Sequence, residues 1–363
     1  MIINENVIYE LSKRLGKKHD VTVFTLYNEY GDNLDFEVKE VCIPFKKNRV
    51  VNAVLSPIFI HKLAEIRNYI EKYDVINTHL YPANIIPLIP YKVGNPLNIV
   101  TEWSGPTGSN LNLKFTEKLY IEFSKKMNKY AAKHANAVIA PCDFVKNWIK
   151  REYGIEAVKM FLDGINFDLF DKNKPYDSIY YKYPSLEDSS VILYVGRVAP
   201  NKNVDMLIKS FNIVKKKIVD AKLVIVGKHS FPEYSKYLRK LVKNYNLEED
   251  VIFTGVVSWE DLPKYYAACD VYATCSAWEG FLRAEAFAME KPMVAFDVSA
   301  NSETIQHGKN GILVKEQTPE AFADALIELL LNDKLRKISR RNRYKWAKEN
   351  LVRCNSREFY KVR

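Results

Sequence analysis

The chain has 363 residues, of which 47% are hydrophobic and 27% charged, a composition that excludes a disordered chain and suits a folded globular protein. The formal net charge of +10 suits anionic partners, such as a nucleotide diphosphate, a lipid phosphate or an anionic membrane face. We expect no nucleic-acid binding, because the sequence has neither zinc-finger spacing nor the aromatic cluster of an RNA-recognition motif.

The five cysteines, at positions 42, 142, 269, 275 and 354, are scattered and form no Cys-x-x-Cys pair. This usage favours a reducing cytoplasm and predicts no structural metal site. The first six residues become polar by the fourth, Asn4, so no secretory signal is visible, and no apolar run reaches transmembrane length. We therefore expect a cytoplasmic protein whose membrane contact, if it has one, is peripheral and on the inner face.

In chain order, the first half alternates predicted helices and strands, which is typical of parallel βαβ units. An amphipathic helix covers residues 7–15, a strand covers 21–25, and a longer helix covers 56–73. Two buried strands follow at 74–79 and 98–101. The first half therefore predicts a domain built on a parallel sheet.

Two residues beside these strands are candidates for an acceptor-side site. His79 ends the first buried strand, where a structural role and a role in a cleft are equally open. Trp103 follows the second strand, in a segment that Gly105 and Pro106 mark as a loop. Its ring either stacks on an acceptor sugar or packs in the core, and the loop favours the sugar.

A long helix is predicted over residues 111–134, with apolar residues at helical spacing. It is rich in lysine, at positions 114, 118, 125, 126, 129 and 133. The main interpretation is an ordinary surface helix with a solvated basic face, and the alternative is a contact with anionic lipid. A strand at 137–141 and a helix that Asp143 is placed to cap come next.

The second half repeats one unit, a short apolar strand that ends in glycine, at residues 191–196, 223–227 and 251–255. Helices at 204–219 and 233–245 separate these strands, which predicts a doubly wound sheet. A glycine after each strand lets backbone amides approach a ligand, although a tight turn alone also requires it.

The first of these strands continues into a loop with two cations, Arg197 and Lys202. A guanidinium on such a loop offers two parallel donors to phosphate oxygens, and a lysine before a helix adds a point charge. The alternative is that both are solvated loop charges.

The stretch at 274–297 predicts a strand, a polar loop, a helix and another buried strand. The loop contains Glu279, Gly280 and Phe281, and the helix begins near Glu285. Open α/β sheets bind ligands outside the carboxyl ends of their strands, and carboxylates there accept hydrogen bonds from sugar hydroxyls. The alternative is that both carboxylates are surface charges beside a core helix.

These two stretches together, with Lys291-Pro292 after the helix, resemble the signature of the retaining glycosyltransferases of family four. The resemblance covers residues 5 to about 349 and implies the GT-B fold, two doubly wound Rossmann-like α/β domains that face a cleft. It implies an acceptor-side domain at 1–170, a linker at 171–190, a nucleotide-sugar domain at 191–345, and a final segment at 346–363 that crosses back.

The resemblance also implies roles for individual residues. Glu279 would bind the transferred sugar, Glu285 the ribose, and Arg197 and Lys202 the donor diphosphate, so Glu279, Arg197 and Lys202 are the catalytic candidates. The donor site would consist of Gly196, Arg197, Lys202, Gly255, Glu279, Gly280, Phe281 and Glu285. No metal or other cofactor is expected, because cations and helix N-termini can neutralise the leaving diphosphate.

The chain departs from the family pattern in three places. Five residues separate Glu279 from Glu285 where the family has seven, and Glu290 replaces the family's glycine before Lys-Pro. The family's first strand and Gly-rich loop are also missing, which predicts that about 20 residues precede this start.

The resulting prediction is a hexosyltransferase that moves a sugar from a nucleotide-diphosphate-sugar to a glycan or lipid-linked glycan acceptor, with retention of configuration. Its setting would be the synthesis of cell-surface polysaccharide, glycolipid or glycoprotein. One alternative is a catalytically degenerate GT-B protein that binds nucleotide or glycan. The other is a GT-B relative such as a nucleotide-sugar 2-epimerase or a phosphorylase.

Overall fold

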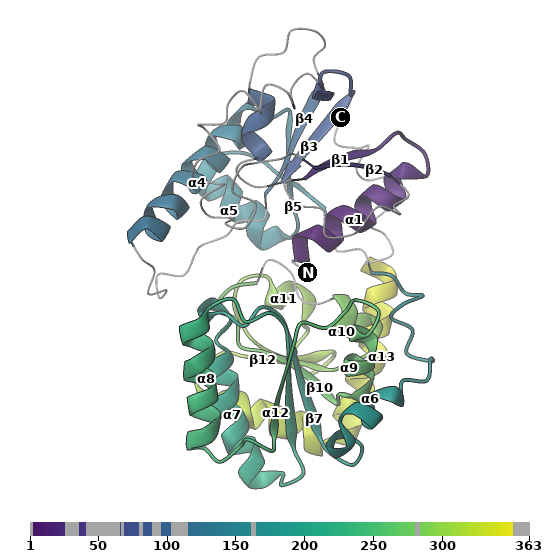
Figure 1. Ribbon diagram of the computed structural model, residues 1–363, viewed down its shortest axis with the longest axis vertical. Coiled ribbons are helices and arrows are strands. Elements are labelled where there is room, and N and C mark those ends of the chain that lie inside the picture. Colours follow the sequence, from purple (N-terminus) through teal and green to yellow (C-terminus); the bar gives the residue numbers. More distant parts are fainter. Residues whose placement is uncertain are drawn as a thin grey trace. The chain divides into compact units, whose positions relative to one another are not determined.

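The computed structural model describes residues 3–25, 36–40, 66, 69–79, 83–88, 96–102, 115–160, 165–279 and 284–350. These residues form two compact units, divided between residues 160 and 165 (Figure 1). Each unit has a parallel sheet with helices, as the alternating pattern predicted. Most of the helix predicted at 56–73 lies outside the described residues.

The first unit is built on a four-stranded parallel sheet with the order β3-β4-β5-β6. Its strands are β3 (Val75–His79), β4 (Leu97–Thr101), β5 (Ala137–Ala140) and β6 (Val158–Lys159), beside a separate parallel pair, β1 (Thr22–Thr25) and β2 (Glu37–Glu40). The helices are α1 (Ile3–Gly16), η2 (Ala83–Leu88, a 3-10 helix), α4 (Phe115–His134) and α5 (Asp143–Tyr153). Ile99 of β4, Ile139 of β5 and Met160 form a small core, against which Leu11 of α1 packs.

The start of α5 corrects one prediction. The N-cap is Cys142, whose backbone is extended and whose Sγ accepts a hydrogen bond from the Val145 amide at 3.5 Å. Asp143 is instead the first helical residue and forms an ion pair with Lys159 of β6. A carboxylate in the first turn is still favoured by the helix dipole, so the sequence pattern was off by one residue.

The second unit has a six-stranded parallel sheet with the order β12-β11-β10-β7-β8-β9. The strands are β7 (Val191–Val195), β8 (Lys222–Val226), β9 (Val251–Gly255), β10 (Val271–Thr274), β11 (Met293–Phe296) and β12 (Gly311–Val314). Because the chain leaves β7 toward β8 and β9 and returns to its other side with β10, the strand order reverses at β7. This is the doubly wound sheet that the glycine-terminated strands predicted.

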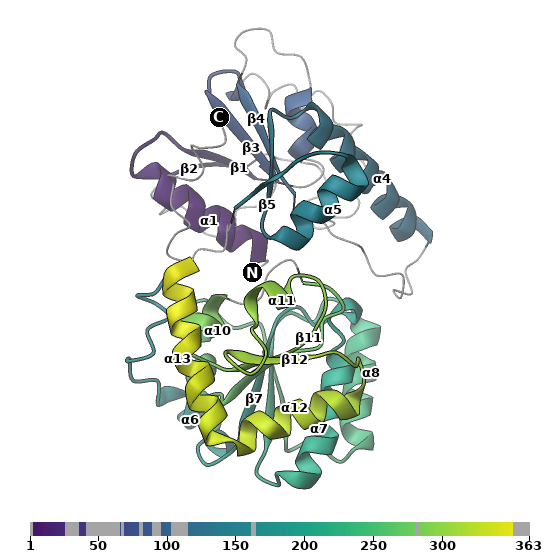
Figure 2. The ribbon, with the colours of Figure 1, turned by 180° about the vertical axis from the view of Figure 1, so that it is seen from behind.

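Helices cover both faces of this sheet (Figure 2). One core joins it to α7 (Val204–Lys217), α8 (Pro232–Asn244) and α12 (Pro319–Leu331). The other joins it to α6 (Ser178–Lys182), α9 (Leu262–Ala268) and α10 (Ala284–Ala288). Shorter helices are η3 (Pro184–Leu186), η4 (Pro200–Lys202) and α11 (Asn301–Thr304), and α13 (Asp333–Asn350) ends the described chain.

The segment at 171–190 is not a free linker. It carries α6 and η3, and Ile179 and Leu186 are buried in the core on the α9 and α10 face. Just before it, Phe170 packs edge-on against Trp259, with 5.0 Å between ring centroids. These apolar side chains fold the segment onto the second unit. Residues 351–363 lie outside the described part, so the expected crossing back to the first domain stays a prediction.

Candidate functional site

The candidate site lies at the carboxyl edge of the second sheet. The parallel strands β10, β7, β8 and β9 are neighbours, so their carboxyl ends line one edge. The loops that leave this edge carry Arg197 and Lys202 after β7, and Glu279 after β10. Since the strand order reverses at β7, this is also where ligands bind in open α/β sheets.

Glycines 196, 227 and 255 follow or end the neighbouring strands β7, β8 and β9. The Gly196 amide donates to the Val226 carbonyl at 2.9 Å, and the Gly227 amide donates to the Gly255 carbonyl at 2.8 Å. Gly227 has φ 144°, and a Cβ there would lie 1.8 Å from the Gly196 carbonyl oxygen. Only glycine fits at 227, while a ligand contact of Gly196 or Gly255 stays a prediction.

The structure joins two of the predicted catalytic residues directly. Lys202 Nζ donates to Glu279 Oε1 at 2.7 Å, and the two side chains are only 11% and 15% exposed. Each was predicted to face the donor separately, one its diphosphate and the other its sugar. A nearly buried ion pair fixes both groups in position, because separating them would leave two charges with little water around them.

Two hydrogen bonds to backbone carbonyls connect the two loops. Asn203 Nδ2 donates to the Cys275 carbonyl at 3.1 Å, and the Ala277 amide donates to the Asn201 carbonyl at 3.2 Å. Asn203 itself has φ 48°, in the left-handed region that Asn tolerates better than most residues. The Lys202 and Glu279 side chains therefore meet on a braced pair of loops.

A third loop also holds Glu279, and the sequence gave no sign of it. The Glu279 amide donates to Ser299 Oγ at 2.9 Å, and the Ala300 amide donates to the Glu279 carbonyl at 3.4 Å. Ser299 follows β11 and has φ 47°. No motif marks an isolated serine of this kind, because its role depends on the β10-β11 pairing.

Arg197 differs from Lys202 in being exposed. Its carbonyl accepts a hydrogen bond from Tyr194 Oη at 2.9 Å, which fixes the backbone of the residue. Among the residues that the structure describes, its guanidinium forms no ion pair. The group is therefore available to an anionic ligand at this edge.

Glu285 is the second residue of α10 and is 8% exposed. Within the described ranges its carboxylate has no hydrogen-bond or ion-pair partner. Its carboxylate oxygens can therefore accept hydrogen bonds from the hydroxyl groups of a ligand. Gly280 and Phe281, which precede it in the predicted donor site, lie outside the described residues.

Beyond the end of α10, Glu290 stands where the family pattern has glycine. Its φ is 57°, so it occupies the left-handed position that commonly ends a helix and that glycine adopts without strain. Glu290 also forms an ion pair with Lys172. The structure thus explains the family's glycine at this point and shows how this chain manages without it.

The acceptor-side candidates belong to the first unit. His79 ends β3, and burial lowers its pKa to about 4, so the ring is neutral at pH 7. Trp103 lies outside the described residues.

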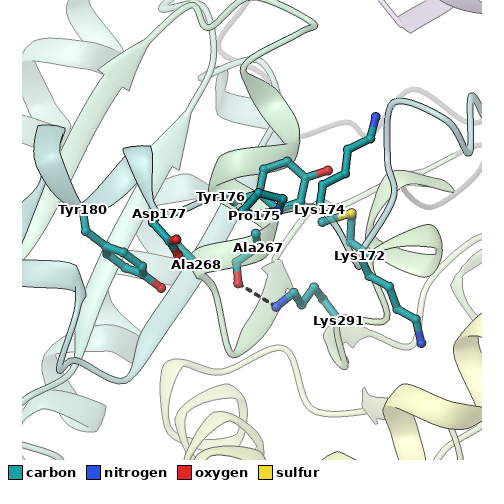
Figure 3. Close-up of a pocket in the computed structure, with 10 residues that line it drawn as sticks. Lys172, Lys174, Pro175, Tyr176, Asp177, Tyr180, Ala267, Ala268 and Lys291 are labelled. Carbon is teal, nitrogen blue, oxygen red and sulfur yellow. Dashed lines mark hydrogen bonds between the residues drawn. The ribbon is translucent and has the colours of Figure 1, made fainter.

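A separate pocket of about 250 Å³ lies at the opposite, amino edge of the second sheet (Figure 3). Lys291, just before β11, lines it and donates to the Ala267 carbonyl at 2.9 Å (Figure 3). It also donates to the Cys269 carbonyl at 2.8 Å. Lys172 pairs with Glu290, and Lys174 bonds to the Asp168 carbonyl. The cations that line this pocket therefore already have partners within the protein.

Within the described ranges, no group of three or more His, Cys, Asp and Glu side chains is arranged to hold a metal ion. In the same ranges, no helix is both long and apolar enough to cross a bilayer.

Two family models match the chain. The model for glycosyltransferase family 4 matches residues 5–168, and the model for glycosyl transferases group 1 matches residues 178–346. The two α/β units and the charged carboxyl edge define the class as GT-B proteins. The chain belongs to the family-four glycosyltransferases.

Individual relatives agree with this class. An uncharacterized glycosyltransferase of Methanocaldococcus jannaschii is 29% identical over 259 residues, covering 69% of this chain and 64% of the relative. A GDP-mannose-dependent alpha-(1-6)-phosphatidylinositol monomannoside mannosyltransferase of Mycobacterium tuberculosis is 29% identical over 178 residues, covering 47% of this chain and 46% of the relative. The chain thus spans less than two thirds of both curated relatives.

Among solved structures, Anabaena HepE in complex with UDP matches with a TM-score of 0.76 and 18% identity, over 97% of this chain and 94% of HepE. At this identity the likeness shows the fold alone.

Proposed function

We propose that the chain is a retaining hexosyltransferase that moves a sugar from a nucleotide-diphosphate-sugar to a glycan or lipid-linked glycan. The observation that carries the proposal is the arrangement at the carboxyl edge. A braced Lys202–Glu279 pair lies on the loops after β7 and β10, Arg197 is exposed after β7, and Glu285 is buried without a described partner. The cations suit the diphosphate of a nucleotide sugar, and the carboxylates suit its hydroxyl groups.

In the proposed reaction the bond between the sugar C1 and the diphosphate oxygen breaks, and a bond from C1 to the acceptor oxygen forms. The acceptor proton passes to the departing phosphate on the same face, which retains the configuration. Arg197 and Lys202 stabilise the charge that develops on the diphosphate. An ammonium has three donors, so Lys202 can hold Glu279 with one and a phosphate oxygen with another.

The donor base and the acceptor are open to experiment. The Mycobacterium relative is named for GDP-mannose and a phosphatidylinositol mannoside, whereas the HepE structure contains UDP. We propose a uridine or guanosine diphosphate sugar as donor and a polysaccharide, glycolipid or glycoprotein intermediate as acceptor. Glu285 would bind the ribose hydroxyls in either case.

We propose a cytoplasmic location with peripheral membrane contact, and we place this contact on helix α4. Phe123 and Tyr130 are 42% and 49% exposed, and the exposed lysines 126 and 133 follow them at helical spacing. Aromatic and basic side chains on one stripe suit an anionic membrane surface. Charge reversal of Lys126 and Lys133 should abolish sedimentation with anionic vesicles; unchanged sedimentation would contradict this contact.

The principal experiment measures thermal unfolding with UDP, GDP, ADP, dTDP and CMP and their sugar conjugates. A nucleotide at about 100 times its dissociation constant should stabilise the chain by about 2.7 kcal/mol. Arg197→Ala should remove most of this shift, and Lys236→Ala, which removes an exposed cation of α8, should keep it. The absence of any shift in folded wild type would contradict the donor site.

Donor turnover then separates the alternatives. The anomer first released by slow donor hydrolysis, read by NMR, should have the configuration of the donor, and the opposite anomer would contradict a retaining enzyme. Binding without turnover, even with acceptors, would favour a degenerate GT-B protein in which the Lys202–Glu279 pair only closes the site. Release of free nucleotide with a changed C2 configuration would favour a 2-epimerase.

A further inference from the structure

The buried arginine of α13 is not explained by the donor site. Arg343 is 0% exposed and is the bulkiest of the fully buried side chains in the described part of the molecule. Its Nε and Nη2 have no hydrogen-bond partner there, and none of the ion pairs found in those ranges includes it. Burial lowers the pKa of its guanidinium well below the usual range. Such a group is costly, so its contacts must offset the cost.

Those contacts centre on Phe287 of α10. The guanidinium carbon lies 4.4 Å from the centre of the Phe287 ring, and Nη1 contacts the sulfur of Met293. Trp346, one turn further along α13, stacks on the same ring at 4.7 Å with an interplanar angle of 29°. Two residues of α13 therefore pack against the same fully buried ring of α10, that of Phe287.

Space around the guanidinium is limited as well. At Gly311, the first residue of β12, a Cβ would lie 2.7 Å from Arg343 Nη2 and 2.6 Å from the Met293 carbonyl oxygen. The sheet thus leaves room for Arg343 only because position 311 is glycine. Arg343 has a defined place between α10 and the start of β11 and β12.

Helix α10, which α13 contacts through Phe287, also carries Glu285. Helix α10 has only 5 residues, too few to be stable without packing, so its position depends on neighbours such as α13 (Figure 2). Successive helical residues turn by about 100°, so Glu285 and Phe287 project to roughly opposite sides of α10. A displacement at Phe287 would therefore move the Glu285 carboxylate along the same line.

We propose that Arg343 and Trp346 are positioning residues, which hold α10 through Phe287 and so set the depth at which the Glu285 carboxylate meets the donor. The role given to Glu285 in this proposal rests on the proposed function. The packing of α10 against α13 does not depend on it. Neither residue touches the reacting atoms. Their effect is on donor affinity rather than on the chemical step.

The test is Arg343→Met, which replaces the charge with an apolar side chain of similar length. The unfolding midpoint should stay level or rise, because a buried unpaired charge is removed. The donor KM should rise about tenfold while kcat changes by less than about twofold. Amide hydrogen exchange in residues 285–289 should become faster. Lys337→Met, the same change at an exposed site on α13, should alter none of these.

Wild-type KM and wild-type exchange in a folded Arg343→Met protein would overturn the proposal. If that variant does not fold, Trp346→Leu replaces it, and the unfolding midpoint, the donor kinetics and the amide exchange are measured in the same way. Wild-type KM and wild-type exchange in the folded Trp346→Leu protein would again overturn the proposal. Failure of the proposed function looks different. The wild type would then turn over no donor, while exchange in α10 would still become faster in the variant.

Discussion

The two edges of the second sheet use charge in opposite ways. At the amino edge, Lys215 and Lys222 both pair with Asp250, at 2.8 Å each. The Asp270 carboxylate there accepts a hydrogen bond from the Val191 amide at 3.0 Å, and Lys291 donates to two carbonyls. These charges join one strand start to the next.

At the carboxyl edge, some charged side chains have no partner within the described part of the protein. Lys202 and Glu279 pair with each other, but Arg197 is exposed without an ion pair, and Glu285 is buried without a partner, in the ranges described. The two edges come from the same strands, so sheet geometry alone does not explain the difference. At the amino edge these charges have protein partners and stabilise the fold, whereas at the carboxyl edge Arg197 and Glu285 have none in the ranges described and belong to the proposed donor site. Each prediction below tests this distinction.

The largest effect is expected from Gly227→Ala at the carboxyl edge. The new Cβ would meet the Gly196 carbonyl at 1.8 Å, and φ 144° is a conformation that alanine rarely adopts. Backbone strain and the forced separation of β7 and β8 should together cost about 4 kcal/mol of unfolding free energy. Denaturant unfolding measures this, with Gly154→Ala as control, where φ is 73° but nothing lies within 4 Å. Equal losses in the two variants would mean that φ strain alone acts.

The next largest effect is on donor affinity, in Arg197→Ala. Loss of two charge-assisted hydrogen bonds to a diphosphate should weaken donor binding about 100-fold, while the unfolding midpoint stays within about 2 °C. Titration calorimetry with the nucleotide found by thermal shift measures the affinity, and thermal unfolding without ligand measures the midpoint. A lowered midpoint with unchanged affinity would assign Arg197 to the fold and remove the distinction between the edges.

Asp250→Asn at the amino edge should have the opposite effect, lowering the stability of the fold without changing donor affinity. It leaves Lys215 and Lys222 without their shared carboxylate and should cost about 2 kcal/mol at pH 7, with donor affinity unchanged. Burial raises the pKa of Asp250, but hydrogen bonds and charge from the two lysines lower it more, so the net shift is downward. Its stabilisation is therefore full above the unfolded pKa of about 3.9 and is lost as pH falls through the lower folded pKa. The wild type should lose this increment in acid, and the variant should have no such loss.

The smallest effect is expected from Glu290→Gly. Glycine relieves the left-handed strain, worth about 1 kcal/mol, but removes a partly exposed ion pair with Lys172 worth up to about 1 kcal/mol. Unfolding free energy should therefore rise by less than about 1 kcal/mol, and donor affinity should not change. A loss larger than 1 kcal/mol would mean that the ion pair outweighs the backbone term.

Much of the second unit was predictable because each of its strands is a continuous apolar run with a clear end. The runs at 191–196, 223–227 and 251–255 became β7, β8 and β9 with small shifts at their ends. The placement of Arg197 and Lys202 on the loop after β7 followed from that. The segment at 171–190 was misjudged, since tyrosine and proline make it look like a linker while Ile179 and Leu186 carry its packing.

The pairings within the site were less predictable. Lys202 and Glu279 are 77 residues apart, and each was assigned to the donor separately, so a direct bond between them had no local signal. Ser299 holds Glu279 through its hydroxyl, and Cys142 replaces Asp143 as a helix cap. Single side chains of this kind depend on which loops the sheet brings together, and periodicity carries no such information.

The separation of 77 positions between Lys202 and Glu279 also determines when during synthesis the pair can form. A ribosome that has completed residue 270 has made β7, β8 and β9 with both loop cations, but neither carboxylate. The Lys202 ammonium acquires its partner only after β10 has emerged and paired with β7. The Lys202–Glu279 pair of the proposed donor site therefore forms only after β10 has been made, and chains cut short before β10 lack it.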